Sequence, residues 1–177
     1  SRGCALSTTP NGATAQLLTR LSDHMSGVVE SVGPSVQQQV VEYVVKIASR
    51  CNLSCDHCYV YRDPDRGWLA KPLFMEPSTA RAAAGRIAEH AAYHRLARVA
   101  VILHGGEPLL LPAARLAQIM AAFRSVIEPV CLLELRMQSN GILLTPEIAE
   151  VLADHHVVVG ISLDGDALAN DRHRIYL

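Results

Sequence analysis

Short apolar runs alternate along the chain with longer segments in which apolar residues recur at helical spacing. The short runs occupy residues 40–48, 99–103, 132–137 and 157–163, and the first of them is rich in β-branched and aromatic residues, as strands usually are. The helical segments occupy residues 77–95, a stretch that starts at Pro112, and a stretch that starts at Thr145. Strict alternation predicts parallel strands with right-handed crossovers, so we expect an α/β fold of about four βα units.

Two stretches do not follow this alternation. Residues 1–38 are rich in Ser, Thr, Gly and Gln, and they predict an N-terminal extension that is partly helical, over residues 14–30, or disordered. Residues 60–76 form a long polar segment with proline and glycine, which predicts a functional or mobile loop that Trp68 packs down. The alternating part, residues 39–177, is expected to fold as one unit.

Composition narrows the class of protein. The chain has 177 residues, half of them hydrophobic, which is enough for one domain with a sizeable core. The net charge of −1 implies no general attraction to nucleic acid or to anionic membranes, and no run approaches the ~18 apolar residues of a membrane span. Five cysteines, three of them clustered, fit a metal centre in a reducing cytoplasm better than a disulfide framework.

The cysteine cluster is the most informative motif. Cys51, Cys55 and Cys58 lie within eight residues, directly after the first expected strand. Thiolates suit iron–sulfur clusters, zinc and copper(I). Three thiolates on one loop can hold three irons of a four-iron cluster and leave the fourth iron open for a substrate, whereas a zinc site would need His57 as an awkward fourth ligand. From these residues alone, a cluster, a zinc site and ordinary thiols all stay open.

Polar motifs also follow the other three expected strands. They are His104-Gly105-Gly106-Glu107-Pro108, Gln138-Ser139-Asn140-Gly141 and Ser162-Leu163-Asp164-Gly165, the last followed by Asn170-Asp171-Arg172-His173-Arg174. Parallel strands end at the same edge of a sheet, where binding loops usually lie, so these motifs should meet the cysteines. Taken alone, each is equally well a turn or, for Asp171 and Arg174, a surface ion pair.

Together, the motifs resemble those of the radical S-adenosylmethionine (radical SAM) enzymes. The matching features are Cys-x-x-x-Cys-x-x-Cys, Gly-Gly-Glu-Pro, Ser-Leu-Asp-Gly and Asn-Asp-x-x-Arg, in the family's order, and the resemblance covers about residues 40–177. One departure is His57, because the family usually has an aromatic residue before the third cysteine. Imidazole can still stack on a purine.

The resemblance implies the fold, the cofactors and a set of site residues. Residues 39–177 would be the N-terminal part of a partial, incomplete parallel β/α barrel of the radical SAM type. Cys51, Cys55 and Cys58 would be the catalytic, metal-binding residues that hold a [4Fe-4S] cluster. Glu107 would receive the amino group of S-adenosylmethionine (SAM), Ser162 would lie near its carboxylate, and Arg174 could pair with a carboxylate. The full set of cofactor-binding candidates is His57, Tyr59, Gly105, Gly106, Glu107, Asn140, Ser162, Asp164 and Arg174.

The resemblance also implies a reaction and its partners. An external one-electron donor would reduce the cluster, SAM would be cleaved, and the 5′-deoxyadenosyl radical would abstract a hydrogen from the substrate. The motifs look most like those of the peptide-modifying, SPASM-type branch, including cyclophane-forming and FxSxx-COOH-type maturases that crosslink side chains of ribosomally made peptides. Alternatives are formylglycine formation, as in anaerobic sulfatase maturases, and a truncated fragment that binds a cluster or peptide without catalysis. We expect this chain to be the N-terminal part of a larger, cytoplasmic enzyme.

Overall fold

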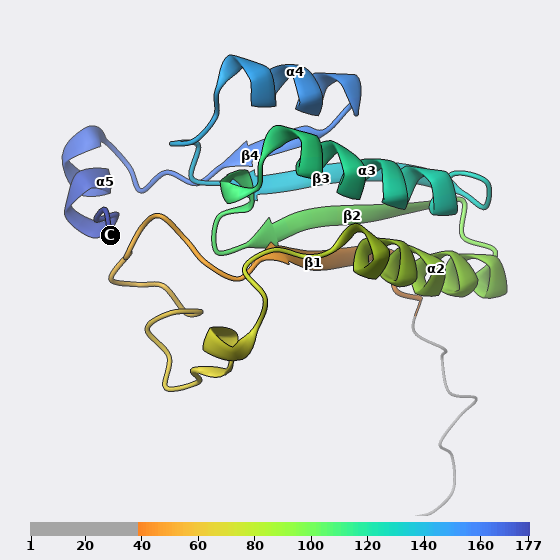
Figure 1. Cartoon of the computed structure of the whole chain (residues 1–177), viewed down its shortest axis with the longest axis horizontal. Helices are drawn as coiled ribbons and strands as arrows, with labels where there is room; N and C mark the ends of the chain where they lie inside the picture. Colours follow the sequence, from red (N-terminus) through yellow and green to blue (C-terminus); the bar gives the residue numbers. More distant parts are fainter. Residues whose placement is uncertain (1–38) are drawn as a thin grey trace, which may run out of the picture. The chain divides into compact units, whose positions relative to one another are not determined.

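The computed structural model describes residues 39–177, and the expected extension with its helix over residues 14–30 lies outside the described residues. A four-stranded, fully parallel sheet forms the centre of the described part, with strand order β1-β2-β3-β4 (Figure 1). The strands are β1 (Glu42–Ala48), β2 (Arg98–Gly105), β3 (Leu132–Ser139) and β4 (Val158–Ile161). The prediction of an α/β fold with a parallel sheet is confirmed.

Helices connect consecutive strands. They are α2 (Pro77–His94), α3 (Ala113–Ile127) and α4 (Pro146–Asp154), with short 3-10 turns η1 (Gly67–Ala70) and η2 (Pro108–Leu110). Pro77 and Pro146 occupy first helical positions, where the missing proline N–H costs no hydrogen bond. Thr145 caps α4 by accepting a hydrogen bond from the Ile148 amide, as its sequence position predicted. The last helix, α5 (Ala167–His173), follows β4.

The hydrophobic core lies between the sheet and these helices. Sequential strands joined by crossovers of one hand place every crossover helix on the same face of the sheet. The buried positions on that face alternate along β2 and β3 and include Leu103, Leu135 and Met137. They meet the apolar stripe of α3, which includes Phe123. The opposite face carries more polar side chains, among which Arg136 pairs with Glu42 and Glu134.

Several elements differ from the expectation. Strand β1 begins at Glu42 rather than at residue 40, and β2 continues to Gly105 rather than ending at residue 103. The fourth strand ends at Ile161, two residues earlier than predicted, although the Ser162 amide still donates a hydrogen bond to the Ser139 carbonyl at 2.9 Å. Helix α5 was not expected, although its N-cap was visible in the sequence: the Asp166 carboxylate accepts a hydrogen bond from the Ala169 amide at 2.9 Å. Among residues 39–177, no helix combines the length and apolar character that crossing a bilayer requires.

Candidate functional site

The carboxyl ends of the four strands meet at one edge of the sheet, which also carries α5 (Figure 1). The cysteine loop follows β1, and the loops after β2, β3 and β4 lie beside it around a cavity of about 180 Å³. The cavity brings together all the predicted site residues except Asp164, namely Cys51, Cys55, His57, Cys58, Tyr59, Gly105, Gly106, Glu107, Asn140, Ser162 and Arg174. Residues from four separate motifs therefore form one site.

The three cysteines of the loop are free thiols, each partly buried. Cys51 Sγ accepts a hydrogen bond from the Leu53 amide at 3.4 Å. Burial raises the pKa of the Cys51 thiol, with the nearby Glu107 carboxylate adding to the effect, and burial also raises the pKa of Cys55. A nearby cation would therefore stabilise the thiolate form of these side chains. No three His, Cys, Asp or Glu side chains within residues 39–177 converge as ligands of a single metal ion.

The two glycines after β2 let that loop approach the start of the cysteine loop. A side-chain carbon on Gly105 would lie 2.3 Å from the Ala48 carbonyl oxygen, and one on Gly106 would lie 2.2 Å from the Arg50 carbonyl oxygen. Because neither glycine has a side chain, two backbone hydrogen bonds form here. The Gly106 amide donates to the Ala48 carbonyl at 3.1 Å, and the Glu107 amide donates to the Arg50 carbonyl at 2.9 Å. The two glycines thus allow a close approach to protein backbone at the wall of the cavity.

Glu107 is almost fully buried, with 1% of its surface exposed. Its Oε1 accepts hydrogen bonds from the Leu109 amide at 3.0 Å and the Ser139 hydroxyl at 2.8 Å, and its Oε2 accepts one from the Asn140 amide at 2.8 Å. A carboxylate has about four acceptor sites, so the expectation that Glu107 receives the amino group of a ligand stays a prediction. Glu107 also connects the loop after β2 to the loop after β3.

Asn140 and Ser162 are held by side chains at the same edge. The side-chain nitrogen Nδ2 of Asn140 donates to Asn52 Oδ1 at 2.8 Å and lies 4.0 Å from Cys51 Sγ. Ser162 Oγ accepts a hydrogen bond from Gln138 Nε2 at 2.7 Å. Gln138 and His104 also line the cavity, although sequence reasoning did not single them out as site residues. The sequence feature that could have identified them is the period of two along a strand, which turns the last residues of β2 and β3 alternately to the two faces of the sheet.

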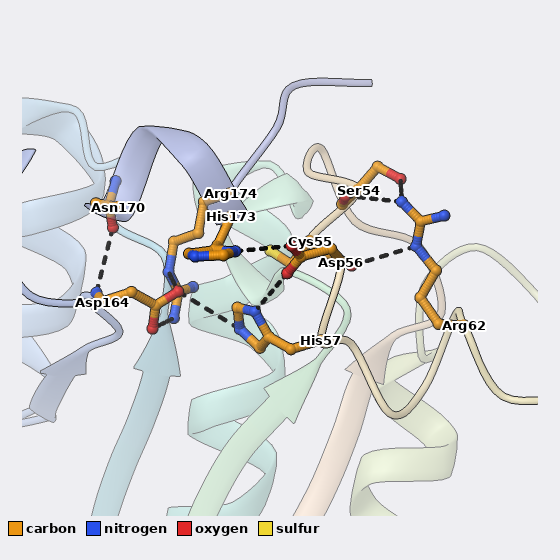
Figure 2. Close-up of polar contacts among 9 residues, drawn as sticks. All are labelled: Ser54, Cys55, Asp56, His57, Arg62, Asp164, Asn170, His173 and Arg174. Atoms are coloured by element: carbon orange, nitrogen blue, oxygen red, sulfur yellow. Dashed lines mark hydrogen bonds and ion pairs between the residues drawn. The ribbon is translucent and has the colours of Figure 1, made fainter. Parts of the chain in front are cut away.

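A chain of polar contacts surrounds the outer side of the cysteine loop (Figure 2). Asp56 accepts from His57 Nδ1 at 3.0 Å and from His173 Nδ1 at 2.7 Å, and these contacts hold the pKa of its carboxyl below the ordinary value. His57 Nε2 lies 3.5 Å from Asp164 Oδ2. Arg174 donates to Asp164 at 2.9 Å and lowers the pKa of that carboxyl. Both nitrogens of His57 are thus engaged, and stacking of its ring on a purine stays a prediction.

This arrangement assigns the partners of two more predicted residues. Arg174 pairs with Asp164, on the loop after β4, and the alternative of an ion pair between Asp171 and Arg174 is wrong. Asp164 does not line the cavity, whereas its partner Arg174 does. Tyr59 lines the cavity with most of its side chain exposed.

Tyr61 stands between this cavity and a larger hollow of about 940 Å³ bounded by the end of β1 and the long loop. Its hydroxyl is buried and has no hydrogen-bond partner within residues 39–177, and burial raises its pKa to about 12. The Trp68 ring meets the Tyr61 ring edge to face at 4.8 Å, and the Arg50 guanidinium lies 5.0 Å from the centre of the Trp68 ring. Trp68 therefore packs the long loop down, as predicted.

The model of the radical SAM superfamily matches residues 45–176. The chain belongs to the radical SAM superfamily. One curated relative, an uncharacterized protein of Synechocystis sp., is 32% identical over 137 residues, which are 74% of this chain and 32% of the relative. The serine-type anaerobic sulfatase-maturating enzyme of Bacteroides thetaiotaomicron is 26% identical over 143 residues, which are 74% of this chain and 31% of that protein. The radical SAM chain thus spans about a third of these relatives.

Solved structures show the same fold. Native anSMEcpe with bound AdoMet superposes with a TM-score of 0.61 at 23% identity, over 75% of the radical SAM chain and 35% of that structure. Native anSMEcpe with bound AdoMet and the Cp18Cys peptide has a TM-score of 0.61 at 21% identity, over 76% of the radical SAM chain and 34% of that structure. These similarities confirm the partial parallel barrel. Family membership implies a [4Fe-4S] cluster and SAM as the cofactors.

The residues of this chain fit those cofactors. Three free thiols on one short loop match the soft donors that iron–sulfur clusters use. The buried Tyr61 hydroxyl, which has no partner within the described residues, leaves a donor at the cavity wall for a further polar group.

Proposed function

We propose that this chain is the cofactor-binding part of a radical SAM enzyme that modifies a ribosomally made peptide by crosslinking its side chains. The observation that carries the proposal is the meeting of three free thiols with the loops after β2, β3 and β4 around one cavity. The three proposed cluster ligands all lie in this chain, so cluster binding can be tested on it.

Each part of the site has a proposed role. Cys51, Cys55 and Cys58 hold the [4Fe-4S] cluster. The other candidate residues that line the cavity contact SAM, and they are His57, Tyr59, Gly105, Gly106, Glu107, Asn140, Ser162 and Arg174. When bound, the cluster and SAM supply reductive carbon–sulfur cleavage and a 5′-deoxyadenosyl radical.

Hydrogen bonds and ion pairs between side chains of the site keep the cavity in shape. Glu107 holds the loops after β2 and β3 together through its three accepted hydrogen bonds. Asp164 fixes the direction of the Arg174 guanidinium, which leaves that cation in place for the carboxylate of a ligand. Gln138 orients the Ser162 hydroxyl in the same way.

Two kinds of similarity support a peptide as the substrate. The motifs resemble those of the peptide-modifying branch, and one solved structure with the same fold contains AdoMet together with a peptide. An external one-electron donor and a reducing compartment such as the cytoplasm belong to this proposal, because the loop cysteines are free thiols.

The second candidate function is formylglycine formation. It is favoured by the 26% identity to a serine-type anaerobic sulfatase-maturating enzyme. The two reactions leave different products, because formylglycine carries an aldehyde that reacts with a hydrazide probe, whereas a side-chain crosslink does not.

The test of the proposal is formation of 5′-deoxyadenosine. The chain is reconstituted anaerobically with iron and sulfide, SAM and dithionite are added, and the product is quantified by mass spectrometry. The Cys55→Ala variant should lose the product, whereas Cys131→Ala, which removes a buried thiol outside the loop, should retain it. A correctly loaded cluster without product would make this chain an incomplete catalyst. Absence of any cluster in the wild-type chain would refute the proposal for this chain.

A further inference from the structure

Residues 173–177, which we call the strap, run antiparallel to residues 52–56 of the cysteine loop. The Ser54 amide donates a hydrogen bond to the Ile175 carbonyl at 2.7 Å. The pairing continues on both sides through Asp56 N–H to His173 O at 3.2 Å, Leu177 N–H to Asn52 O at 3.3 Å, and a bridge between Leu53 and Tyr176. A segment more than a hundred residues away in sequence thus supplies the backbone partners of the loop that carries Cys55.

Side chains fasten the strap at its first two residues (Figure 2). His173 Nδ1 donates to Asp56 Oδ2 at 2.7 Å, which ties the strap to the cysteine loop. The next residue, Arg174, donates to Asp164 at 2.9 Å, which ties the strap to the loop after β4. Asp164 in turn lies 3.5 Å from His57 Nε2, so the contacts return to the cysteine loop.

Arg62 holds the opposite side of the same loop. Its guanidinium donates to the Ser54 carbonyl at 3.2 Å, to the Ser54 hydroxyl at 3.0 Å and to the Cys55 carbonyl at 3.3 Å. Figure 2 shows Arg62 and His173 on opposite sides of this turn. The Ser54 and Asp56 amides therefore face the strap and the Ser54 and Cys55 carbonyls face Arg62, so protein contacts alone fix the backbone around Cys55.

We propose that the strap positions the cysteine loop for its cluster, and that the contact between Asp56 and His173 is the main fastening. His173 acts as a positioning residue through Asp56 and does not itself bind iron. The inference rests on the proposed function, because it takes Cys51, Cys55 and Cys58 as the cluster ligands. Groups that orient metal ligands from behind commonly change metal affinity by about 10–100-fold when they are removed.

The cluster experiment compares three variants with the wild-type chain. His173→Ala removes the donor to Asp56, His173→Asn returns a nitrogen donor near the position of Nδ1, and His94→Ala removes an imidazole at the end of α2 as a control. Each protein is loaded anaerobically and exposed to an iron chelator, and loss of the visible absorbance of the cluster is followed. We expect His173→Ala to lose its cluster about tenfold faster, with His173→Asn and His94→Ala close to wild type. The electron paramagnetic resonance spectrum of the reduced cluster should shift in His173→Ala only.

Hydrogen exchange of the metal-free chain tests the strap without the cluster. The Ser54 and Asp56 amides should exchange slowly in the wild type, and about tenfold faster in His173→Ala, because each loses the fixed carbonyl partner that the strap presents. If exchange and cluster loss are both unchanged in His173→Ala, the proposal that the strap positions the cysteine loop is overturned. A wild-type chain that takes up no cluster would refute the proposed function, and the exchange result would still decide whether the strap holds the loop.

Discussion

Replacing Glu107 with glutamine would test whether this carboxylate holds the site together. Three donors reach the two carboxylate oxygens: the Leu109 amide and the Ser139 hydroxyl at Oε1, and the Asn140 amide at Oε2. Glutamine keeps one acceptor oxygen and replaces the other with an NH2 group. If the oxygen faces Leu109 and Ser139, the NH2 group points at the Asn140 N–H. If the side chain is flipped, the NH2 group points at the Leu109 N–H.

Either orientation leaves one buried backbone donor facing another donor. A hydrogen bond to a charged acceptor contributes about 1.5–3 kcal/mol, and a buried donor left without a partner costs about 1–3 kcal/mol. We therefore expect the free energy of unfolding of Glu107→Gln to fall by about 3 kcal/mol. That is a large share of the roughly 5–15 kcal/mol that stabilises a typical domain.

The assay is urea unfolding of the metal-free chain, followed by circular dichroism. A lower midpoint at an unchanged slope would show a loss of stability rather than a change in compactness. Glu150→Gln, at an exposed position of α4, is the matched control and should stay within about 0.5 kcal/mol of wild type. If Glu107→Gln unfolds like that control, the carboxylate does not hold the two loops together and our account of its role in the fold is wrong.

Two further predictions concern the same edge of the sheet. Gly106→Ala should lower the free energy of unfolding by about 1–3 kcal/mol, because the new methyl group would collide with the Arg50 backbone. Gly85→Ala should raise it by about 0.5–1 kcal/mol, because the methyl group would enter open space on α2. Equal effects of the two substitutions in calorimetry would refute this contrast. Because Arg174 lowers the pKa of Asp164, that carboxylate contributes stability above the unfolded pKa of about 3.9, and the contribution is lost as pH falls through the lower folded value. The stability difference between wild type and Asp164→Asn should therefore shrink on acidification, and a difference independent of pH would contradict the ion pair.

Much of the sheet could be predicted from local pattern. The expected strand at 132–137 and the observed β3 (Leu132–Ser139) begin at the same residue, and the expected helix at 77–95 differs from α2 by one residue. Local signals were sufficient there, because short apolar runs, proline at first helical positions and the Thr145 cap all act within a few residues.

The roles of individual site residues depended on contacts that no local pattern encodes. Glu107 is a predicted ligand contact, and no local pattern shows that its Oε2 also accepts from the Asn140 backbone amide, 33 residues further along the chain. The contact between Asp56 and His173 joins residues 117 apart. The sequence could predict that the motifs meet, because parallel strands share an edge, but which donor reaches which acceptor is decided by the packed tertiary structure.

The distance in sequence between the cysteine loop and the strap has a consequence for biosynthesis. The loop is synthesised more than a hundred residues before its partner segment. During translation the cysteines therefore leave the ribosome without the backbone partners that hold them in the finished fold, and closing such a long loop is slow. Iron that reached the nascent chain would meet an unconstrained loop, so efficient maturation calls for cluster delivery after residue 177 has been made.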